Sequence, residues 1–175
     1  MRKIDWDSVQ EAADAPRPTP GGYIARIDSV TDVAEKEYLL IEWDFAVGAF
    51  KGSNAETFAR ARFWPYPLRR SYKERAMGFF KRLKRDLEES NHGYTFREEE
   101  LGAMRGKLLG VILAEEEYRA KDGTVKTRLS VVRTCPVEDI KAGRFEVPDV
   151  KRLKPTAAAP SATFTDLDDD GELPF

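Results

Sequence analysis

Tyr38-Leu-Leu-Ile-Glu-Trp-Asp-Phe-Ala-Val47 places a large apolar side chain at every second position. Leu39, Ile41, Trp43 and Phe45 share one face, while Tyr38, Leu40, Glu42 and Asp44 share the other. A period of two is typical of a β-strand with one face buried against a core. The sequence therefore predicts a strand over residues 38–47 that covers a hydrophobic core.

Similar patterns on either side of this segment predict four further strands. The expected strands are 23–33, 57–64, 107–119 and 124–134, and Asp122-Gly123 between the last two favours a tight hairpin turn. A helix is expected from Ser71, which forms a capping-box pattern with Glu74, through a stripe at Ala76, Phe79, Phe80, Leu83 and Leu87 to Asn91. Short helical turns are expected at 95–102 and 137–142, and 144–153 fits an edge strand or an extended arm.

The order of these elements favours one fold class. Five strands with the helix between the third and the fourth is the order of an OB-fold, a five-stranded Greek-key barrel. The alternative is a β-sandwich with an inserted helix. We expect an N-terminal arm at 1–20, this domain at 21–154, a Pro-, Ala- and Thr-rich flexible linker at 155–165 and an acidic tail at 166–175.

The bulk composition fits one ordinary domain with tails. The chain has 175 residues, of which 41% are hydrophobic and 34% are charged. No run of 18 apolar residues indicates a membrane span, and the charged N-terminus lacks the apolar stretch of a secretory signal. Cys135 is the single cysteine, so an internal disulfide is excluded. We expect a cytoplasmic protein.

The charges are unevenly distributed along the chain. Residues 156–175 hold five acids and no Lys or Arg, which leaves 29 basic against 26 acidic residues, a charge of +3, for residues 1–155. Residues 58–85 hold ten basic residues, with Glu74 as the one acid. A mildly basic body with an acidic tail is an asymmetry that needs an explanation.

Aromatic residues alternate with these cations, a combination that suits unpaired nucleotides. Cations follow phosphates, while flat rings stack on bases of any sequence. The expected strand at 57–64 would place Arg60, Arg62 and Trp64 on one face with Phe58. The helix cations at 81–85 are equally consistent with a solvated face. The candidate DNA-binding residues are Arg60, Arg62, Trp64, Tyr66, Arg69, Arg70, Lys73, Tyr118, Arg119, Lys121, Lys126 and Arg128.

The last ten residues, Asp-Leu-Asp-Asp-Asp-Gly-Glu-Leu-Pro-Phe175, form the most specific motif in the chain. Acids that lead into Leu-Pro-Phe make this tail similar to the tip of bacterial single-stranded DNA-binding proteins, although Gly171-Glu172 interrupts the run. The resemblance implies that the tail binds replication or recombination proteins. Its site residues would be the acids Asp168, Asp169, Asp170 and Glu172, which steer the encounter, and the apolar Leu173, Pro174 and Phe175, of which Phe175 is the anchor.

Modest motifs in the body resemble the same family in its phage and prophage branch from Gram-positive hosts. They are Pro20-Gly-Gly-Tyr23, Tyr38-Leu-Leu-Ile-Glu-Trp43, Ser71-Tyr-Lys-Glu74 with Phe79-Phe80, Gly106-Lys-Leu-Leu-Gly110, Phe145-Glu-Val-Pro148 and Lys151-Arg-Leu-Lys154. The resemblance spans nearly the whole chain. It implies an OB-fold, sequence-tolerant binding of single-stranded DNA, and a role in phage replication or recombination.

Other functions remain open in the sequence. A strand-annealing or recombination-mediator protein would bind DNA similarly, and a protein-interaction adaptor would use the barrel for a polypeptide. No cofactor motif or metal-ligand spacing is present, and no nucleophile stands beside a recognisable base, so we expect neither a cofactor nor catalysis. The oligomeric state is open, and a homo-oligomer is one possibility.

Overall fold

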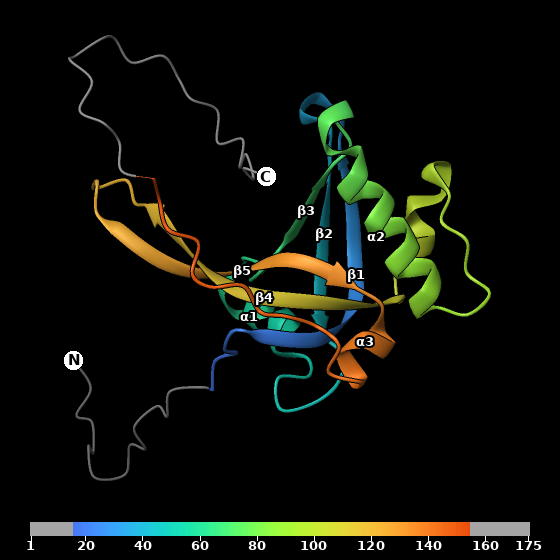
Figure 1. Cartoon of the computed structure of the whole chain (residues 1–175), viewed down its shortest axis with the longest axis horizontal. Coiled ribbons are helices and arrows are strands. Elements are labelled where there is room, and N and C mark those ends of the chain that lie inside the picture. Colours follow the sequence, from blue (N-terminus) through green and yellow to red (C-terminus); the bar gives the residue numbers. More distant parts are fainter. Residues whose placement is uncertain (1–15, 155–175) are drawn as a thin grey trace, which may run out of the picture.

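The computed structural model describes residues 16–154, so the expected linker, the acidic tail and most of the N-terminal arm lie outside the described residues. The described part is mainly β, a five-stranded antiparallel sheet in the order β3-β2-β1-β4-β5 (Figure 1). The strands are β1 (Gly21–Val33), β2 (Tyr38–Phe45), β3 (Leu68–Ser71), β4 (Leu108–Arg119) and β5 (Val125–Cys135). The helices are α1 (Ser53–Ala61), α2 (Met77–Ser90) and α3 (Val137–Lys141), with 3-10 turns η2 (Ala34–Lys36), η3 (Glu74–Ala76) and η4 (Glu98–Met104).

The predicted alternation of β2 is confirmed. Leu39, Ile41, Trp43 and Phe45 are each at most 2% exposed and form the centre of the hydrophobic core. Next to β2 lies β1, the longest strand, which pairs with β2 over 25–33 and with β4 over 21–26, with an irregularity in register after Ile27. Because β1 pairs with β2 along one part of its length and with β4 along another, the β2 side and the β4 side of the sheet share one core.

The predicted β4–β5 hairpin is also confirmed. Gly123 has φ of +80°, and its N–H donates to the carbonyl of Ala120 at 2.9 Å. Asp122 Oδ1 accepts the backbone N–H of Thr124 at 3.0 Å, which holds the turn. Residues 144–154 lie alongside β4 as an extended arm, joined through Lys151, whose N–H donates to Glu115 and whose carbonyl accepts from Glu117.

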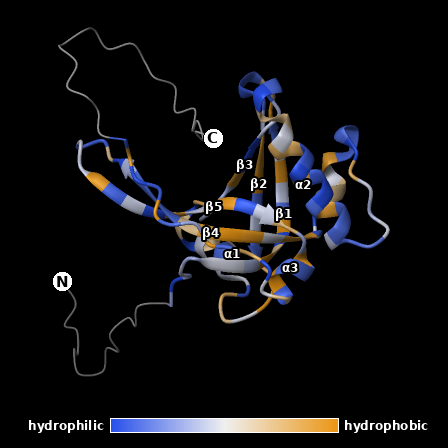
Figure 2. Ribbon diagram, viewed as in Figure 1, coloured by the Kyte–Doolittle hydropathy of each residue, from blue (hydrophilic) through white to orange (hydrophobic). Residues whose placement is uncertain are grey.

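The predicted apolar stripe of α2 is confirmed at its last three positions, whereas Phe79 is half-buried, Ala76 lies in η3 before the helix, and the predicted start is wrong. Phe80, Leu83 and Leu87 are buried, and Figure 2 shows hydrophobic and hydrophilic residues alternating along the helix. Ser71 does not cap α2, because it is the last residue of β3 and its hydroxyl accepts the N–H of Lys73 at 3.2 Å. Within the described ranges, no helix is long and apolar enough to cross a membrane.

The predicted third strand at 57–64 is wrong. Residues 53–61 form α1, and the third strand of the sheet is the short β3 at 68–71. Arg62 ends the helix in the left-handed region with φ of 60°. The alternation of Arg with apolar residues resembles the pattern of a strand. The start of α1 is stabilised instead by Asp44, which is remote from it in the sequence.

Candidate nucleic-acid interface

Asp44 fixes the start of α1 against the end of β2. Its carboxylate is 1% exposed, and Oδ1 accepts the N–H groups of Phe45 at 2.8 Å and Asn54 at 3.1 Å. Oδ2 accepts the N–H of Ala55 at 3.0 Å. The first N–H groups of a helix have no partner inside the helix. Asp44 therefore supplies acceptors, and a negative charge, where α1 needs them.

The segment that follows α1 is attached to the same strand. The carbonyl of Trp43 accepts the indole N–H of Trp64 at 2.7 Å and the side-chain N–H of Asn54 at 2.9 Å. In return, the indole N–H of Trp43 donates to the carbonyl of Tyr66 at 2.7 Å. Trp64 is thus half-buried with its N–H engaged, and it positions the α1 connection instead of standing free as a stacking platform.

The outer surface of this connection carries cations and rings that face solvent. Arg60 and Arg62 are exposed, and neither side chain has a hydrogen bond or ion pair with another described residue. Phe63 is 58% exposed, and Phe58 is 39% exposed with its ring 5.5 Å from that of Trp64. Exposed apolar rings that gather in one patch mark a binding surface more often than single exposed rings do. We call Phe58, Arg60, Arg62, Phe63 and Trp64 the α1 surface.

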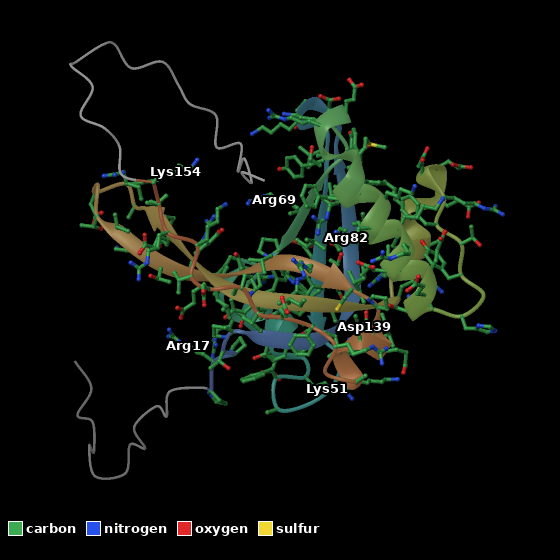
Figure 3. All side chains as sticks on the ribbon, viewed as in Figure 1. Arg17, Lys51, Arg69, Arg82, Asp139 and Lys154 are labelled. Atoms are coloured by element: carbon green, nitrogen blue, oxygen red, sulfur yellow. The ribbon has the colours of Figure 1, made fainter. Side chains whose placement is uncertain are left out.

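The register places further candidates at the same end of the sheet. Phe45, the last residue of β2, pairs with Ala25, while Leu113 of β4 pairs with Gly21, so β4 continues past the start of β1 toward the hairpin tip. The α1 surface, residues 16–20 and the hairpin therefore belong to one end. Arg17, labelled left of the sheet in Figure 3, lies close enough to Tyr66 to lower its pKa, while the larger effect of burial raises that pKa.

The hairpin cations are largely engaged with their own hairpin. Arg128 pairs with Glu116 at 2.7 Å and lies 5.2 Å from the centre of the Tyr118 ring. Lys126 is 3.9 Å from Asp122, and Arg119 donates to the carbonyl of Gly123 at 3.3 Å, whereas Lys121 is exposed without a described partner. Exposed pairs of this kind contribute little, so phosphates could compete for these cations.

The cations of β3 and of the segment that follows it divide between surface and interior. Arg69 is exposed, and Lys73 is half-buried with a partner. Arg70 is only 6% exposed, and its Nε lacks a hydrogen-bond partner in the described part of the chain. Burial lowers the pKa of Arg70 to about 10, although Asp86 opposes the shift. Arg70 therefore belongs to the interior and leaves the candidate surface.

Phe58 and Phe63 were not among the predicted site residues. Both lie in the predicted third strand, whose alternation placed Phe63 on the face opposite Arg60 and Arg62. Because the segment is not a strand, the exposure of this ring was not predicted. A local signal was present. Residues 53–61, Ser-Asn-Ala-Glu-Thr-Phe-Ala-Arg-Ala, contain three Ala, one Glu and one Arg, all of which favour helix.

Replacing Asp44 by Ala should lower the free energy of unfolding by about 2 kcal/mol, because three N–H groups, two of them in buried hydrogen bonds, would lose a charged acceptor. Guanidinium chloride unfolding measures this change. Glu56→Ala is the matched control, since Glu56 lies exposed in the first turn of α1 and should change stability by less than about 0.5 kcal/mol. Equal costs for the two variants would contradict the capping role of Asp44.

Among residues 16–154, no three His, Cys, Asp or Glu side chains are grouped so that they could hold a metal ion. Comparison with known proteins finds no matching family model and no matching curated protein. The chemistry of the exposed side chains is therefore the basis for assigning a function.

Proposed function

We propose that this protein is a sequence-tolerant single-stranded DNA-binding protein that coats exposed strands and catalyses no reaction. The observation that supports the proposal most strongly is the α1 surface, where two exposed arginines without an ion-pair partner among the described residues lie between two exposed phenylalanines in the sequence. Free guanidinium groups attract phosphates, and a ring that faces solvent offers a base a stacking partner whatever its identity. Duplex DNA, whose bases are already stacked, would use only the charges.

The topology supports an OB-fold as the scaffold. In the order β3-β2-β1-β4-β5, the central β1 pairs with β2 on one side and β4 on the other, and α2 follows β3 in the chain. An OB-fold is a partly open five-stranded Greek-key barrel that binds oligonucleotides with the face of its second and third strands and the loop between its fourth and fifth. The α1 surface connects β2 to β3, and the β4–β5 hairpin extends from the same end of the sheet.

The tail gives the proposal its second part. Asp168, Asp169, Asp170 and Glu172 next to Leu173-Pro174-Phe175 combine charge with an apolar anchor, which suits a basic, apolar pocket on another protein. We propose that replication or recombination proteins bind there while the domain holds DNA. A negative tail would also be repelled by the DNA phosphates, which favours its availability to partners.

Titration of the full chain with fluorescently labelled oligo-dT tests the DNA-binding proposal. Arg17, Arg60, Arg62 and Arg69 are four exposed cations without described ion pairs. If each contacts one phosphate, the slope of log K against log salt should be about −3 for a single strand. A duplex of equal length should bind more weakly at every salt concentration. Absence of binding at low salt, or binding that ignores salt, would contradict the proposal.

A further inference from the structure

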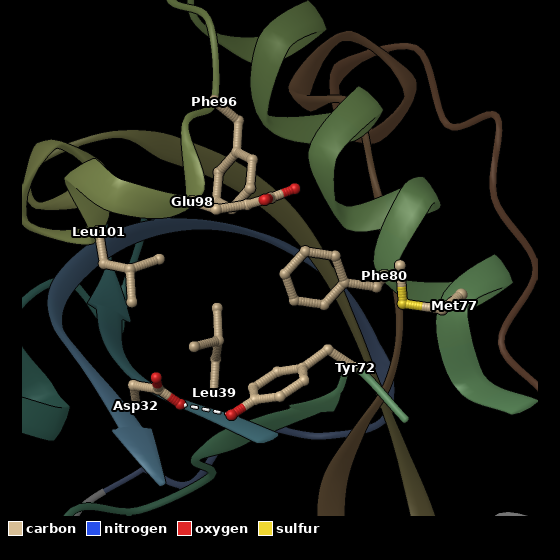
Figure 4. A pocket seen from close by; sticks show the side chains of 8 residues that line it. All are labelled: Asp32, Leu39, Tyr72, Met77, Phe80, Phe96, Glu98 and Leu101. Carbon is tan, nitrogen blue, oxygen red and sulfur yellow. Dashed lines mark hydrogen bonds between the residues drawn. The ribbon is translucent and has the colours of Figure 1, made fainter. Parts of the chain in front are cut away.

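An open hollow of about 360 Å³ lies between the β1–β2 hairpin and the N-terminal half of α2 (Figure 4). Its floor is apolar, because the rings of Tyr72, Phe80 and Phe96 and the side chains of Leu39 and Leu101 point into one space. Met77, at the edge, is 47% exposed. This volume lies within the range of roughly 300–1,000 Å³ in which proteins bind small groups or side chains.

The charges at the hollow are all negative. Asp32 and Glu98 lie on opposite sides of it, and no described lining residue is a cation. The hydroxyl of Tyr72 donates to Asp32 Oδ1 at 2.8 Å, which leaves the second carboxylate oxygen of Asp32 for another donor. Glu98 is exposed and has no side-chain partner in the described ranges. The hollow therefore favours an apolar group accompanied by a positive charge.

A phosphate does not suit a hollow whose charges are negative. The hollow also lies apart from the α1 surface. Asp32 pairs with Leu39 beside the β1–β2 turn, whereas α1 follows Phe45 at the other end of β2. The hollow would thus stay accessible while the α1 surface binds DNA. Its occupant is independent of the proposed function.

We propose that the hollow binds residues 2–6, Arg-Lys-Ile-Asp-Trp, of a second copy of this chain. Arg2 and Lys3 have the charge that the rim lacks, and Ile4 and Trp6 supply apolar groups for the floor. The acidic tail also has apolar residues, but its five acids would be repelled by Asp32 and Glu98. Residues 2–6 carry a net side-chain charge of +1, because Asp5 offsets one of the two cations, whereas residues 155–175 carry −5. Charge therefore selects residues 2–6 over the tail.

The length of the N-terminal segment favours binding to the hollow of a second copy over binding to the hollow of the same molecule. From Trp6 to Pro16 there are ten residues, which span at most roughly 35 Å when fully extended. Pro16 precedes the start of β1, and Asp32 lies eleven residues beyond Gly21 on that strand, up to roughly 36 Å at the usual rise. An arm that bound its own hollow would have to be extended over most of its length. Contact between one arm and the next copy's hollow is head-to-tail, and it links copies in a row.

Sedimentation velocity of the full chain without DNA tests this contact. The mass should rise with protein concentration, and Trp6→Ala or Glu98→Arg should each weaken association by about 30-fold, as loss of an anchoring residue does. Glu98 is exposed, so its replacement should leave the far-UV circular dichroism unchanged, and Thr95→Arg, at an exposed residue outside the hollow, is the matched control.

Mixing the two variants gives the decisive result. Trp6→Ala retains an intact hollow and Glu98→Arg retains an intact arm, so an equimolar mixture should form a dimer and nothing larger. A charge-swapped pair should also associate. In this pair, one protein carries Arg2→Glu and Lys3→Glu, and the other carries Glu98→Arg. A wild-type chain that stays monomeric, variants that associate like the wild type, or a mixture that gains no dimer would each overturn the proposal.

Discussion

Charge reversal of the α1 surface, Arg60→Glu with Arg62→Glu, should raise the Kd for oligo-dT about 100-fold at low salt. Both side chains are exposed and unpaired in the described structure, so their only expected role is toward an outside anion. Loss of a charge-assisted contact costs about 1.5 kcal/mol, and two such losses amount to about 3 kcal/mol. The salt slope should also flatten by about 1.4, since each single-strand phosphate contact contributes about 0.7.

A matched variant separates local contact from net charge. Lys84→Glu with Arg105→Glu changes the total charge equally, and both residues are exposed cations without described ion pairs. They lie on α2 and after η4, away from the α1 surface. This control should weaken binding less than about threefold, through long-range attraction alone. Equal losses in the two double variants would mean that the α1 surface does not contact DNA.

Phe63→Ala distinguishes stacking from charge on the same surface. The ring is 58% exposed, so its removal should leave the fold intact. Stacking on one base contributes roughly 1–3 kcal/mol, and the Kd should therefore rise about tenfold or more. The salt slope should stay the same because no cation is lost. A steeper or flatter slope would show that Phe63 acts through the position of its neighbouring arginines.

Most of the sheet could be predicted because its signals are local. The period of two in β2 and the Asp122-Gly123 turn depend on residues that are neighbours in sequence. The α1 helix depends instead on Asp44, whose carboxylate reaches Asn54 and Ala55, ten and eleven residues away. No local pattern contains that contact. The alternating arginines therefore predicted a strand, and Arg60 and Arg62 were assigned to a strand where the structure has the helix α1 and its C-cap.

The burial of Arg70 shows the same limit in the interior. As a β3 residue it alternates with Arg69, but which of the two faces inward depends on where the sheet meets α2. One signal was readable: Asp86 follows Leu83 by three residues and precedes Leu87, so it lies on the buried stripe of the helix. An acid on a buried stripe indicates a buried partner, although the sequence does not identify it.

Asp86→Ala should lower the free energy of unfolding by about 4 kcal/mol, the largest stability effect we expect. Asp86 is fully buried, accepts the hydroxyl of Thr134 on β5 at 2.8 Å, and pairs with Arg85 at 2.7 Å. Its charge also opposes the lowering of the Arg70 pKa by burial, although no ion pair joins these two described side chains. Removing one member of a buried charge pair typically costs 3–5 kcal/mol. Guanidinium chloride unfolding measures the loss.

Two controls assign that cost to the buried charge. Thr134→Val removes only the hydroxyl that donates to Asp86 and should cost about 1 kcal/mol. Glu89→Ala removes the exposed carboxylate that lies 3.9 Å from Arg85 and should cost less than about 0.5 kcal/mol. If Asp86→Ala costs no more than Thr134→Val, the hydrogen bond to β5 accounts for the whole role of Asp86.

The double variant Arg70→Met with Asp86→Leu should be more stable than Asp86→Ala alone. The charge of Asp86 on α2 opposes the lowering of the Arg70 pKa on β3, and its Oδ2 accepts the hydroxyl of Thr134 on β5, so this carboxylate acts on both edge strands of the sheet. Replacing both charges by apolar groups of similar size removes the uncompensated guanidinium, which is the costly species. Recovery of about 2 kcal/mol or more would identify Arg70 as the source of the loss. No recovery would mean that Asp86 stabilises the fold through Thr134 and Arg85, and that the two edges are held together without Arg70.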